Sequence, residues 1–394
     1  MPGPCAKTKT KVIEEKDLSN FRLVEDFARR LEAFEGKAVG TFADPRRLLG
    51  QGDYLSLLLF GLLNPVIDSM RGLCAASSLG RLQEDLGVRR VSLGSFSEVQ
   101  AVIDPSLLEK VLASLVEEQR RVSRADSALK PRDQSLLMAV DSTVWKVLPR
   151  MAWAYWRHQN GAQNAVRLHV KFNVHDDAAV EATLAGAKSC ERAALLQSAK
   201  AGEFYVGDRY YGANLGGFEA LRARGCAFIF RLQDDVIFES AALESELSAA
   251  DRAAGVVFDG MVHLGRGKKH PPVRLVRIVI EGGDLLLVTD QKPEDFSAEL
   301  VAATYRKRWQ IEMFFKWLKC ILGCRHWFAE SERGVRVQIY CALIAALLLA
   351  RSVGRRPGKR IMEMLAFYMS GYASLEELMA AIESEENRRQ KTRA

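Results

Sequence analysis

The stretch LLMAVDSTVWKVL, residues 136–148, carries most of the information about the fold. It is rich in apolar and β-branched residues, which favour strands over helices. A single carboxylate, Asp141, stands inside this apolar run. Burying a carboxylate among apolar side chains is unfavourable unless a cation, a metal ion or hydrogen-bond donors compensate its charge. The stretch therefore predicts a strand, and Asp141 becomes a candidate functional residue.

The residues that follow alternate between strand and helix patterns. Four segments carry the alternation: the strands VRLHVKFNVHDD (166–177) and VEATLAG (180–186), the helix CERAALLQSA (190–199) and the strand EFYVGD (203–208). The last strand ends at a second carboxylate, Asp208. Strands that alternate with a helix predict an α/β sheet with a parallel component. Residues 228–289 again have strand character, in FIFRL, GVVFDG, VRLVRIVI and DLLLVTD.

Length and composition set wide bounds on function. The chain has 394 residues, enough for two or three domains, and a formal net charge of +7, which makes a polyanionic partner plausible. A basic soluble protein without nucleic acid is the alternative. Seven scattered cysteines without paired spacing indicate reduced thiols in a cytoplasmic protein. The apolar runs 54–67 and 339–350 fall short of the roughly 18 to 20 residues of a membrane span, so we expect buried core helices and no membrane partner.

The N-terminal region has a helical pattern from about residue 21 to residue 130. Asp104 and Pro105 are typical of a helix start, and Ser95 and Glu98 have the spacing of a capping box. Residues 79–103 predict two short helices joined by a turn at Gly87. A DNA-reading helix-turn-helix has this pattern, and so has any small helical bundle.

A long helix is predicted from a cap at Ser297 to about Gly323. Projected at about 100° per residue, five polar residues of this helix share one stripe. They are Tyr305, Arg308, Glu312, Lys316 and Lys319. The apolar residues Ile311, Phe314, Trp317, Leu318 and Ile321 fall on the opposite face, which we expect to be buried. The polar stripe is either a solvated face with ordinary ion pairs or a carboxylate surrounded by phosphate-binding groups.

Phosphoryl transfer on DNA requires oxygen ligands for hard divalent cations. In two-metal sites the ions lie about 3.5 to 4 Å apart and act on the attacking and leaving oxygens. Asp141, Asp208 and Glu312 have the character of such ligands, since two lie on strands of one sheet and one lies on a helix. We therefore predict a metal site at these three residues, with two Mg²⁺ ions as cofactor and Mn²⁺ as substitute.

At this point three motifs resemble a known family. Tyr305, Arg308, Glu312 and Lys319 reproduce the signature Tyr-x2-Arg-x3-Glu-x6-Lys, which resembles that of bacterial insertion-sequence transposases of the DDE class, the IS-four-type group. AVDSTVWKVLPRMAWAYW and EFYVGDRYYG are similar to the motifs around the first and second aspartate of that group. The resemblance spans roughly residues 136–349. It implies that Asp141, Asp208 and Glu312 are catalytic, and that Tyr305, Arg308 and Lys319 contact DNA.

The resemblance also implies a domain organisation and a fold. The fold is α/β, with a ribonuclease H-like catalytic core, a β-rich insertion, a helical N-terminal domain and a short helical tail. The expected ranges are 1–130 for a helical domain that binds DNA ends, 131–230 with 289–352 for the catalytic domain, 231–288 for the insertion, and 353–394 for a basic linker and tail.

The implied activity is cut-and-paste transposition: hydrolysis of a phosphodiester at the element ends, then strand transfer into target DNA. The implied partners are the terminal inverted repeats, the target DNA and a second copy of the chain. The implied location is the prokaryotic cytoplasm, at the nucleoid. Two alternatives remain: a ribonuclease H-like nuclease that never joins strands, and a catalytically silent DNA-binding protein derived from a transposase.

The insertion should extend or flank the core sheet without supplying metal ligands. Its carboxylates are then expected in turns or at the surface: Asp234, Asp235, Asp259 and Asp284. Its basic loop GRGKKH (265–270), with Lys268 and Lys269, is expected to face DNA together with Arg274 and Arg277. A solvated basic loop is the competing interpretation.

Overall fold

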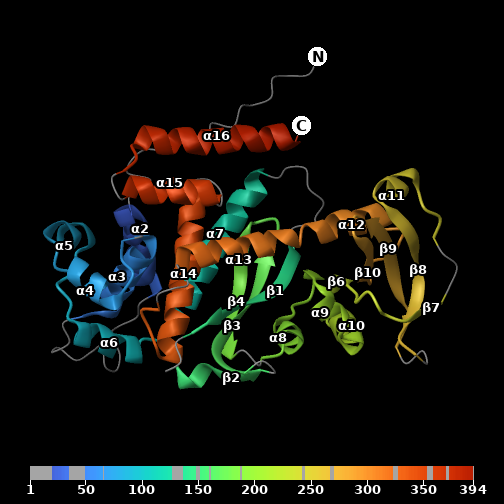
Figure 1. Cartoon of the computed structure of the whole chain (residues 1–394), viewed down its shortest axis with the longest axis horizontal. Helices are drawn as coiled ribbons and strands as arrows, with labels where there is room; N and C mark the ends of the chain where they lie inside the picture. Colours follow the sequence, from blue (N-terminus) through green and yellow to red (C-terminus); the bar gives the residue numbers. More distant parts are fainter. Residues whose placement is uncertain are drawn as a thin grey trace, which may run out of the picture. The chain divides into compact units, whose positions relative to one another are not determined.

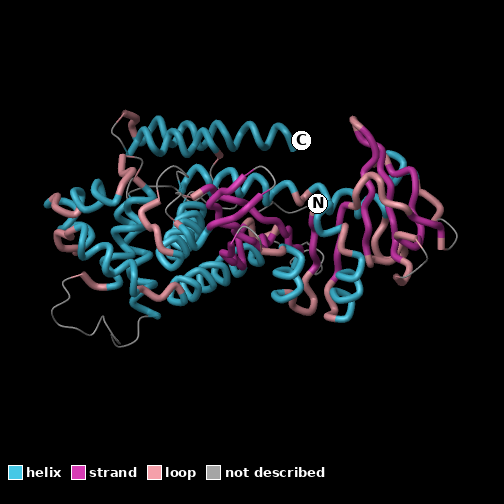
Figure 2. Tube along the Cα trace, turned by 60° about the horizontal axis from the view of Figure 1, so that its bottom comes forward, coloured by secondary structure: helices cyan, strands magenta, loops and turns pink. Residues whose placement is uncertain are grey.

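The computed structural model divides into two compact units (Figure 1). One unit comprises Met1–Glu117 and Trp317–Ala394, and the other comprises Glu118–Lys316. The structure describes residues 20–34, 49–64, 66–126, 136–147, 151–158, 161–186, 189–241, 245–266, 270–322, 327–352, 358–369 and 372–393. Figure 2 shows that helices make up the first unit, whereas the strands belong to the second.

The helical unit is built around two apolar helices. Its described helices are α2 (Asn20–Phe34), α3 (Gln51–Leu63), α4 (Met70–Ala76), α5 (Gly80–Leu86), α6 (Leu93–Val102), the first half of α7 (Ser106–Asp126), the end of α13 (Trp309–Leu322), α14 (Glu332–Ser352), α15 (Lys359–Met369) and α16 (Leu375–Arg393). Most residues of α3 are buried, and α3 packs against α14. The aromatic rings of Tyr54 on α3 and Phe96 on α6 lie 4.5 Å apart. Residues 317–352, which we predicted as the C-terminal part of the catalytic domain, lie in one compact unit with the N-terminal helices.

Helix α14 explains the longest apolar run of the chain. Its stretch Glu332–Arg351 is long and apolar enough to cross a membrane by length and composition, with a mean hydropathy of 1.6. However, 83% of this window is buried inside the protein. A core helix satisfies the same criteria of length and composition, and the contacts of α14 with α3 and α6 account for its burial. The expected core helix over residues 339–350 is confirmed.

Two short helices, α5 and α6, lie where the sequence predicted a helix-turn-helix pattern. Gly87 ends α5 with a positive φ of 66°, a conformation that favours glycine. The capping prediction for α6 is wrong in detail. Ser92, rather than Ser95, caps the helix by accepting a hydrogen bond from the Ser95 backbone N–H.

The described residues of the second unit form a sheet of ten strands. They are β1 (Leu137–Lys146), β2 (Tyr155–His158), β3 (Gly161–Asn173), β4 (Ala178–Gly186), β5 (Phe204–Gly207), β6 (Ala227–Arg231), β7 (Phe238–Ser240), β8 (Val256–Leu264), β9 (Val273–Ile280) and β10 (Gly283–Thr289). The order is β2-β3-β1-β5-β6-β10-β9-β8-β7, with β4 on the other edge of β3. The helices of this unit are α8 (Glu191–Ser198), α9 (Arg209–Gly212), α10 (Leu215–Ala223), α11 (Ala249–Ala253), α12 (Ala298–Arg306), the start of α13 and a short 3-10 helix (Ala152–Ala154).

The centre of the sheet has the predicted parallel component. Strand β1 pairs antiparallel with β3 and parallel with β5, and β5 pairs parallel with β6. Strand β1 is buried from Leu137 to Val140, as its apolar sequence predicts. The α/β class expected from the alternation of strands and helices is confirmed.

The strands after residue 231 extend this same sheet. Strand β10 pairs antiparallel with β6, and β9, β8 and β7 follow outward. A continuous buried cluster joins β1, β5 and β6 to β8, β9 and β10. At its centre Phe228 lies 5.0 Å from Phe218 and 5.2 Å from Phe230, measured between ring centroids. Strands β8, β9 and β10, which lie in the range predicted as an insertion, therefore share their hydrophobic core with the central strands.

The buried pair Arg274–Asp259 corrects two predictions about the insertion. Both side chains are buried, and the guanidinium donates from Nε and Nη2 to the two carboxylate oxygens over 2.7 Å each. Nη1 of Arg274 donates to the backbone carbonyls of Gln291 and Phe296. Asp259 is therefore not a surface carboxylate, and Arg274 does not face solvent. The pair joins β8 and β9 to the segment that leads into α12.

The predicted helix over residues 297–322 is in fact two helices. Ser297 caps α12 as expected, by accepting a hydrogen bond from the Leu300 N–H. Lys307 and Arg308 then form a turn, in which the N–H of Arg308 bonds to the carbonyl of Tyr305, three residues back. Such tight bonds interrupt an α-helix without glycine or proline. Tyr305 consequently lies on α12 and Glu312 on α13.

Candidate active site

Asp141 lies in the middle of β1, at the face of the sheet that packs against α13. Its cross-strand partner on β3 is Val170, and partners in an antiparallel pair point to the same face. Phe172, two residues along β3, shares this face, and its ring lies 5.1 Å from that of Phe314 on α13. Asp141 therefore points toward the helix that carries Glu312.

The charge of Asp141 is poorly compensated. Burial is the largest cause that raises its pKa, the nearby carboxylates of Asp208 and Glu191 also raise it, and the resulting pKa is about 7. A hydrogen bond of 2.7 Å from the Ser142 N–H and the charge of Arg308 act in the opposite direction. A buried carboxylate beside two others is an environment that a bound cation would relieve.

Asp208 follows β5 and caps the short helix α9. Its Oδ1 accepts a hydrogen bond of 2.9 Å from the Tyr210 N–H. In the parallel pairing of β1 and β5, Ala139 is opposite Val206, so Asp141 and Asp208 stand at corresponding positions two residues further along. Helix α9 packs closely on the neighbouring strand: a Cβ at Gly212 would lie 1.9 Å from the carbonyl oxygen of Arg231. This glycine lets the chain turn at the second aspartate.

Glu312 lies in the first turn of α13 and is half-buried. Its Oε1 is 2.6 Å from Nη1 of Arg308. The same guanidinium lies over the ring of Tyr305, 5.6 Å from the centroid. The side chain of Tyr305 is only 7% exposed. Its ring therefore packs under the Arg308 guanidinium and is largely inaccessible to solvent. Burial raises the pKa of Tyr305, while Arg308 and Arg231 lower it and Asp208 raises it.

Arg308 thus links the three predicted acidic residues. It pairs with Glu312, and its charge acts on Asp141, which in turn lies in the field of Asp208. Carboxylate oxygens suit hard divalent cations, so the donor chemistry fits the expected ions. Among the described residues, no three Asp, Glu, His or Cys side chains are close enough to form a ready metal site. Glu312 would have to exchange Arg308 for an ion in order to join the two aspartates.

The predicted DNA contacts differ in their surroundings. Lys316 is exposed, with its ammonium 5.3 Å from the centroid of the Trp309 ring. Lys319 is also exposed, two turns beyond Glu312, in the part of α13 that belongs to the helical unit. Arg277 is paired with Asp284 through Nη2 and Oδ2 at 2.5 Å. Lys268 and Lys269 lie outside the described residues.

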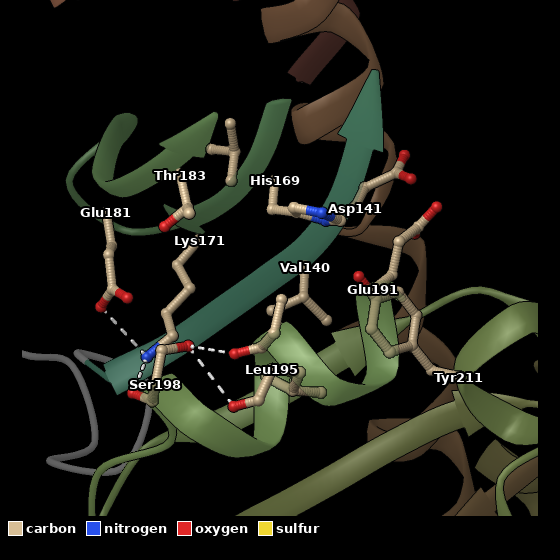
Figure 3. A pocket seen from close by; sticks show the side chains of 12 residues that line it. Val140, Asp141, His169, Lys171, Glu181, Thr183, Glu191, Leu195, Ser198 and Tyr211 are labelled. Atoms are coloured by element: carbon tan, nitrogen blue, oxygen red, sulfur yellow. Dashed lines mark hydrogen bonds and ion pairs between the residues drawn. The ribbon is translucent and has the colours of Figure 1, made fainter. Parts of the chain in front are cut away.

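The sequence did not single out Glu191, which opens α8. Glu191 is 8% exposed, pairs with Arg167 on β3, and its charge acts on Asp141 and on Tyr211. A glutamate in the first turn of a helix is favourable on its own, because it complements the helix dipole. Its pattern in the sequence therefore gave no functional signal. Figure 3 shows Glu191, Asp141 and Tyr211 together at one end of a pocket.

Arg231 was also not predicted. It ends β6, next to the strand that ends at Asp208, and its charge acts on Tyr305. Its Nη2 is 3.2 Å from Oδ1 of Asp234, while its buried Nε has no hydrogen-bond partner. Only the pairing of β5 with β6 reveals that this arginine lies near the acidic residues.

The family model described as "Transposase DDE domain" matches residues 132–348, more than half of the chain. The chain belongs to this family. It is a DNA transposase, an enzyme that cleaves DNA and transfers strands, and enzymes of this family use divalent metal ions. The match includes Asp141, Asp208 and Glu312 within one domain.

Several transposases are similar to this chain. It is 25% identical over 249 residues to the transposase y4zB of Sinorhizobium fredii. This alignment covers 61% of this chain and 67% of that protein. It is 25% identical over 269 residues to a Geobacillus stearothermophilus protein named for insertion sequence element IS5377, covering 67% and 68%. A piggyBac transposase synaptic complex with hairpin DNA aligns over 95% of this chain and 85% of that chain, at 9% identity and a TM-score of 0.41. A TM-score this low does not establish a shared fold.

Proposed function

We propose that this transposase serves an insertion sequence of the IS-four-type group and moves it by cut-and-paste transposition. In this proposal Asp141, Asp208 and Glu312 hold two Mg²⁺ ions, with Mn²⁺ as substitute. The observation that carries the proposal is the pairing of β1 and β5. It sets the two aspartates at corresponding positions of parallel strands, within the field of the Arg308–Glu312 pair. The names of similar proteins, which refer to insertion sequence elements, support the same conclusion.

When bound, the ions activate the attacking oxygen and stabilise the leaving oxygen of the phosphodiester. The three carboxylates would hold the ions, and Arg308 would neutralise charge on a phosphate once Glu312 has released it. In the first step a water oxygen bonds to phosphorus, the P–O3′ bond at the element end breaks, and the departing oxygen becomes a 3′-hydroxyl. In the second step this hydroxyl attacks a target phosphorus, losing its proton, while the target's own 3′-oxygen leaves with a proton.

The remaining residues and regions receive DNA-binding roles in this proposal. Arg308, Lys316 and Lys319 hold phosphates next to the cleaved bond, and the buried Tyr305 contributes by supporting Arg308. Lys268 and Lys269 follow the backbone nearby, and the N-terminal helices recognise the terminal inverted repeats. Both the central strand order and the position of Asp141 on its first strand support a ribonuclease H-like core with residues 231–288 as insertion. A homodimer would bring two ends together in the cytoplasm, at the nucleoid.

Cleavage of the DNA that flanks the coding region tests this function. Purified protein is incubated with labelled duplexes from both flanks, a target plasmid and Mg²⁺. We expect a cut at an inverted repeat, followed by joining of the freed 3′ end to the plasmid. Asp141→Asn, Asp208→Asn and Glu312→Gln should each abolish both steps and still bind the ends. Asp295→Asn, an exposed carboxylate before α12, is the matched control and should remain active.

The outcome separates the alternatives. A nuclease of the same fold would cut the duplexes and never join them to the plasmid. A silent DNA-binding protein would shift the duplexes in a gel and leave them intact in every divalent ion tested. Wild-type cleavage by the Asp208→Asn variant would refute the assignment of the acidic residues.

A further inference from the structure

Arg167 connects the strand of Asp141 to α8. Its guanidinium Nη1 donates to Glu191, the first residue of α8, and to the Ser142 hydroxyl at 3.0 Å. Ser142 in turn donates its backbone N–H to Oδ1 of Asp141 at 2.7 Å. A chain of three polar contacts therefore runs from Glu191 to the carboxylate that we assign as a metal ligand.

This series of contacts lies on the face of the sheet opposite to the Asp141 side chain. Ser142 pairs with His169 and Val144 pairs with Arg167, so these side chains share the face opposite to Asp141. That face is covered by α8, where Lys171 donates to the carbonyl of Ser198. Asp141 faces α13, and its neighbour Ser142 faces α8. A shift of Ser142 on one face must therefore move Asp141 on the other.

The buried charges of Glu191 and Arg167 compensate each other. The side chain of Glu191 is 10% exposed and that of Arg167 is 20% exposed. Burial, and then the charge of Arg167, lowers the pKa of His169 to about 4, so this neighbouring imidazole is neutral near pH 7 and does not compensate Glu191. Without Arg167, an uncompensated carboxylate would lie buried in range of Asp141 and Asp208.

We propose that the buried Glu191–Arg167 pair is a positioning device for the cleavage reaction, which orients Asp141 through Ser142. The proposal rests on the assignment of Asp141 as a metal ligand. Glu191 and Arg167 act through Ser142, in addition to the direct effect of the Glu191 charge on Asp141. Residues that orient metal ligands in this manner change metal affinity or activity by roughly 10- to 100-fold when they are altered.

The alternative is that the pair merely fastens α8 to the sheet. A second buried pair in the same unit offers a matched control: Lys171 and Glu203 lie 3.2 Å apart, with side chains 5% and 10% exposed. Figure 3 shows Lys171 at the end of the pocket opposite to Asp141 and Glu191. Glu203 accepts hydrogen bonds from the Lys171 ammonium and the Tyr205 hydroxyl. A purely structural pair should behave as this control does.

The test is a Mg²⁺ titration of single-turnover cleavage by the full-length protein on its own end DNA. For Glu191→Gln and Arg167→Lys we expect a half-saturating Mg²⁺ concentration or a cleavage rate altered by roughly 10- to 100-fold. The dissociation constant for end DNA, measured in Ca²⁺, should stay within about twofold, because phosphate contacts dominate affinity. Glu203→Gln should lower the unfolding temperature and leave the Mg²⁺ dependence unchanged.

A double variant, Glu191→Gln with Arg167→Lys, sharpens the test. If the two residues act as one unit, its loss of rate should be smaller than the product of the two single losses. Arg167→Lys keeps a positive charge next to Glu191, so we expect this variant to fold. The Mg²⁺ titration can therefore be carried out on it even if Glu191→Gln unfolds. Wild-type Mg²⁺ dependence in both single variants, or an equal change in Glu203→Gln, would overturn the proposal. Failure of the proposed function is distinct, because the wild-type protein itself would not cut.

Discussion

Asp141 and Asp259 are both carboxylates in strands of the same sheet, yet their surroundings are opposite. Asp259, in β8, is 4% exposed and receives two hydrogen bonds of 2.7 Å from Arg274. Asp141, in β1, receives one hydrogen bond from a backbone N–H and has two further carboxylates in range. The buried charge of Asp259 in β8 is thus compensated within the protein, whereas the charge of Asp141 in β1 is not.

The difference separates a structural carboxylate from one prepared for a ligand. A bidentate arginine bonds to both oxygens of Asp259 and compensates its charge inside the protein. The charge of Asp141 would be compensated only by a bound ligand such as a metal cation. Asp259, which lies between Asp208 and Glu312 in sequence, is therefore a structural residue.

Removing the open carboxylates should have the largest effect. Asp141→Asn or Asp208→Asn should lower the cleavage rate by about 10⁴-fold or more, the size of loss seen when one member of a catalytic unit is removed. The unfolding temperature in EDTA should not fall, since the substitution relieves repulsion between neighbouring carboxylates. Single-turnover cleavage and thermal unfolding, measured on the same preparations, check both statements.

Breaking the compensated pair should affect stability instead. Arg274→Met leaves Asp259 buried without its cation, which should lower the free energy of unfolding by about 3 to 5 kcal/mol. The double variant Arg274→Met/Asp259→Leu should recover a large part of that loss, because an apolar pair needs no compensation. Urea unfolding of the three proteins measures both values. A double variant as unstable as the single one would contradict a pairwise explanation.

Much of this contrast was accessible from the sequence. The β-branched run around Asp141 predicted β1, and the strand ending at Asp208 predicted its parallel neighbour. The helix start at Ser297 was predicted as well, because a serine side chain satisfies free N–H groups at a helix terminus. These features depend on residues close together in sequence, so local pattern was sufficient.

Other features depend on strand register and could not be predicted. Arg274 looked like one more cation of a basic segment, and its partner lies on the adjacent strand, 15 residues away. The break at Lys307 and Arg308 carries no glycine or proline to reveal it. Glu191 and Arg167 come together only because α8 covers one particular face of β3. A residue's neighbours across a sheet are set by pairing, which sequence spacing does not encode.

The raised pKa of Asp141 predicts a pH effect of intermediate size. Its folded pKa of about 7 lies above the ordinary value of 3.8, so between these values the folded protein holds a proton that the unfolded chain releases. The free energy of unfolding contributed by this bound proton is present in full below about pH 3.8 and is lost as the pH rises to about 7. Over that range the free energy of unfolding falls by at most about 1.4 kcal/mol per pH unit. Asp141→Asn removes this contribution.

The metal-free Asn variant should therefore gain stability relative to wild type as pH rises from 4.5 to 7.5. Urea unfolding in EDTA at several pH values gives the difference directly. Asp259→Asn is not a suitable control, because it breaks an ion pair, so the exposed Asp295→Asn serves instead. A wild-type-to-Asn difference that stays constant across this range would argue against a raised pKa at Asp141.

The smallest effect should appear in the salt dependence of DNA binding. Here the basic residues near Glu312 are compared with an exposed arginine elsewhere. Arg308→Gln and Lys319→Ala each remove one proposed phosphate contact. Each should make the slope of log K against log salt less negative by about 0.9, since one contact releases about that many counterions. Arg252→Gln changes an exposed arginine at the end of α11 and should leave the slope unchanged. Titrations at several salt concentrations, in Ca²⁺, measure all three slopes. Unchanged slopes for Arg308→Gln and Lys319→Ala would mean that the cations around Glu312 form a solvated face, and that the acidic residues act without them.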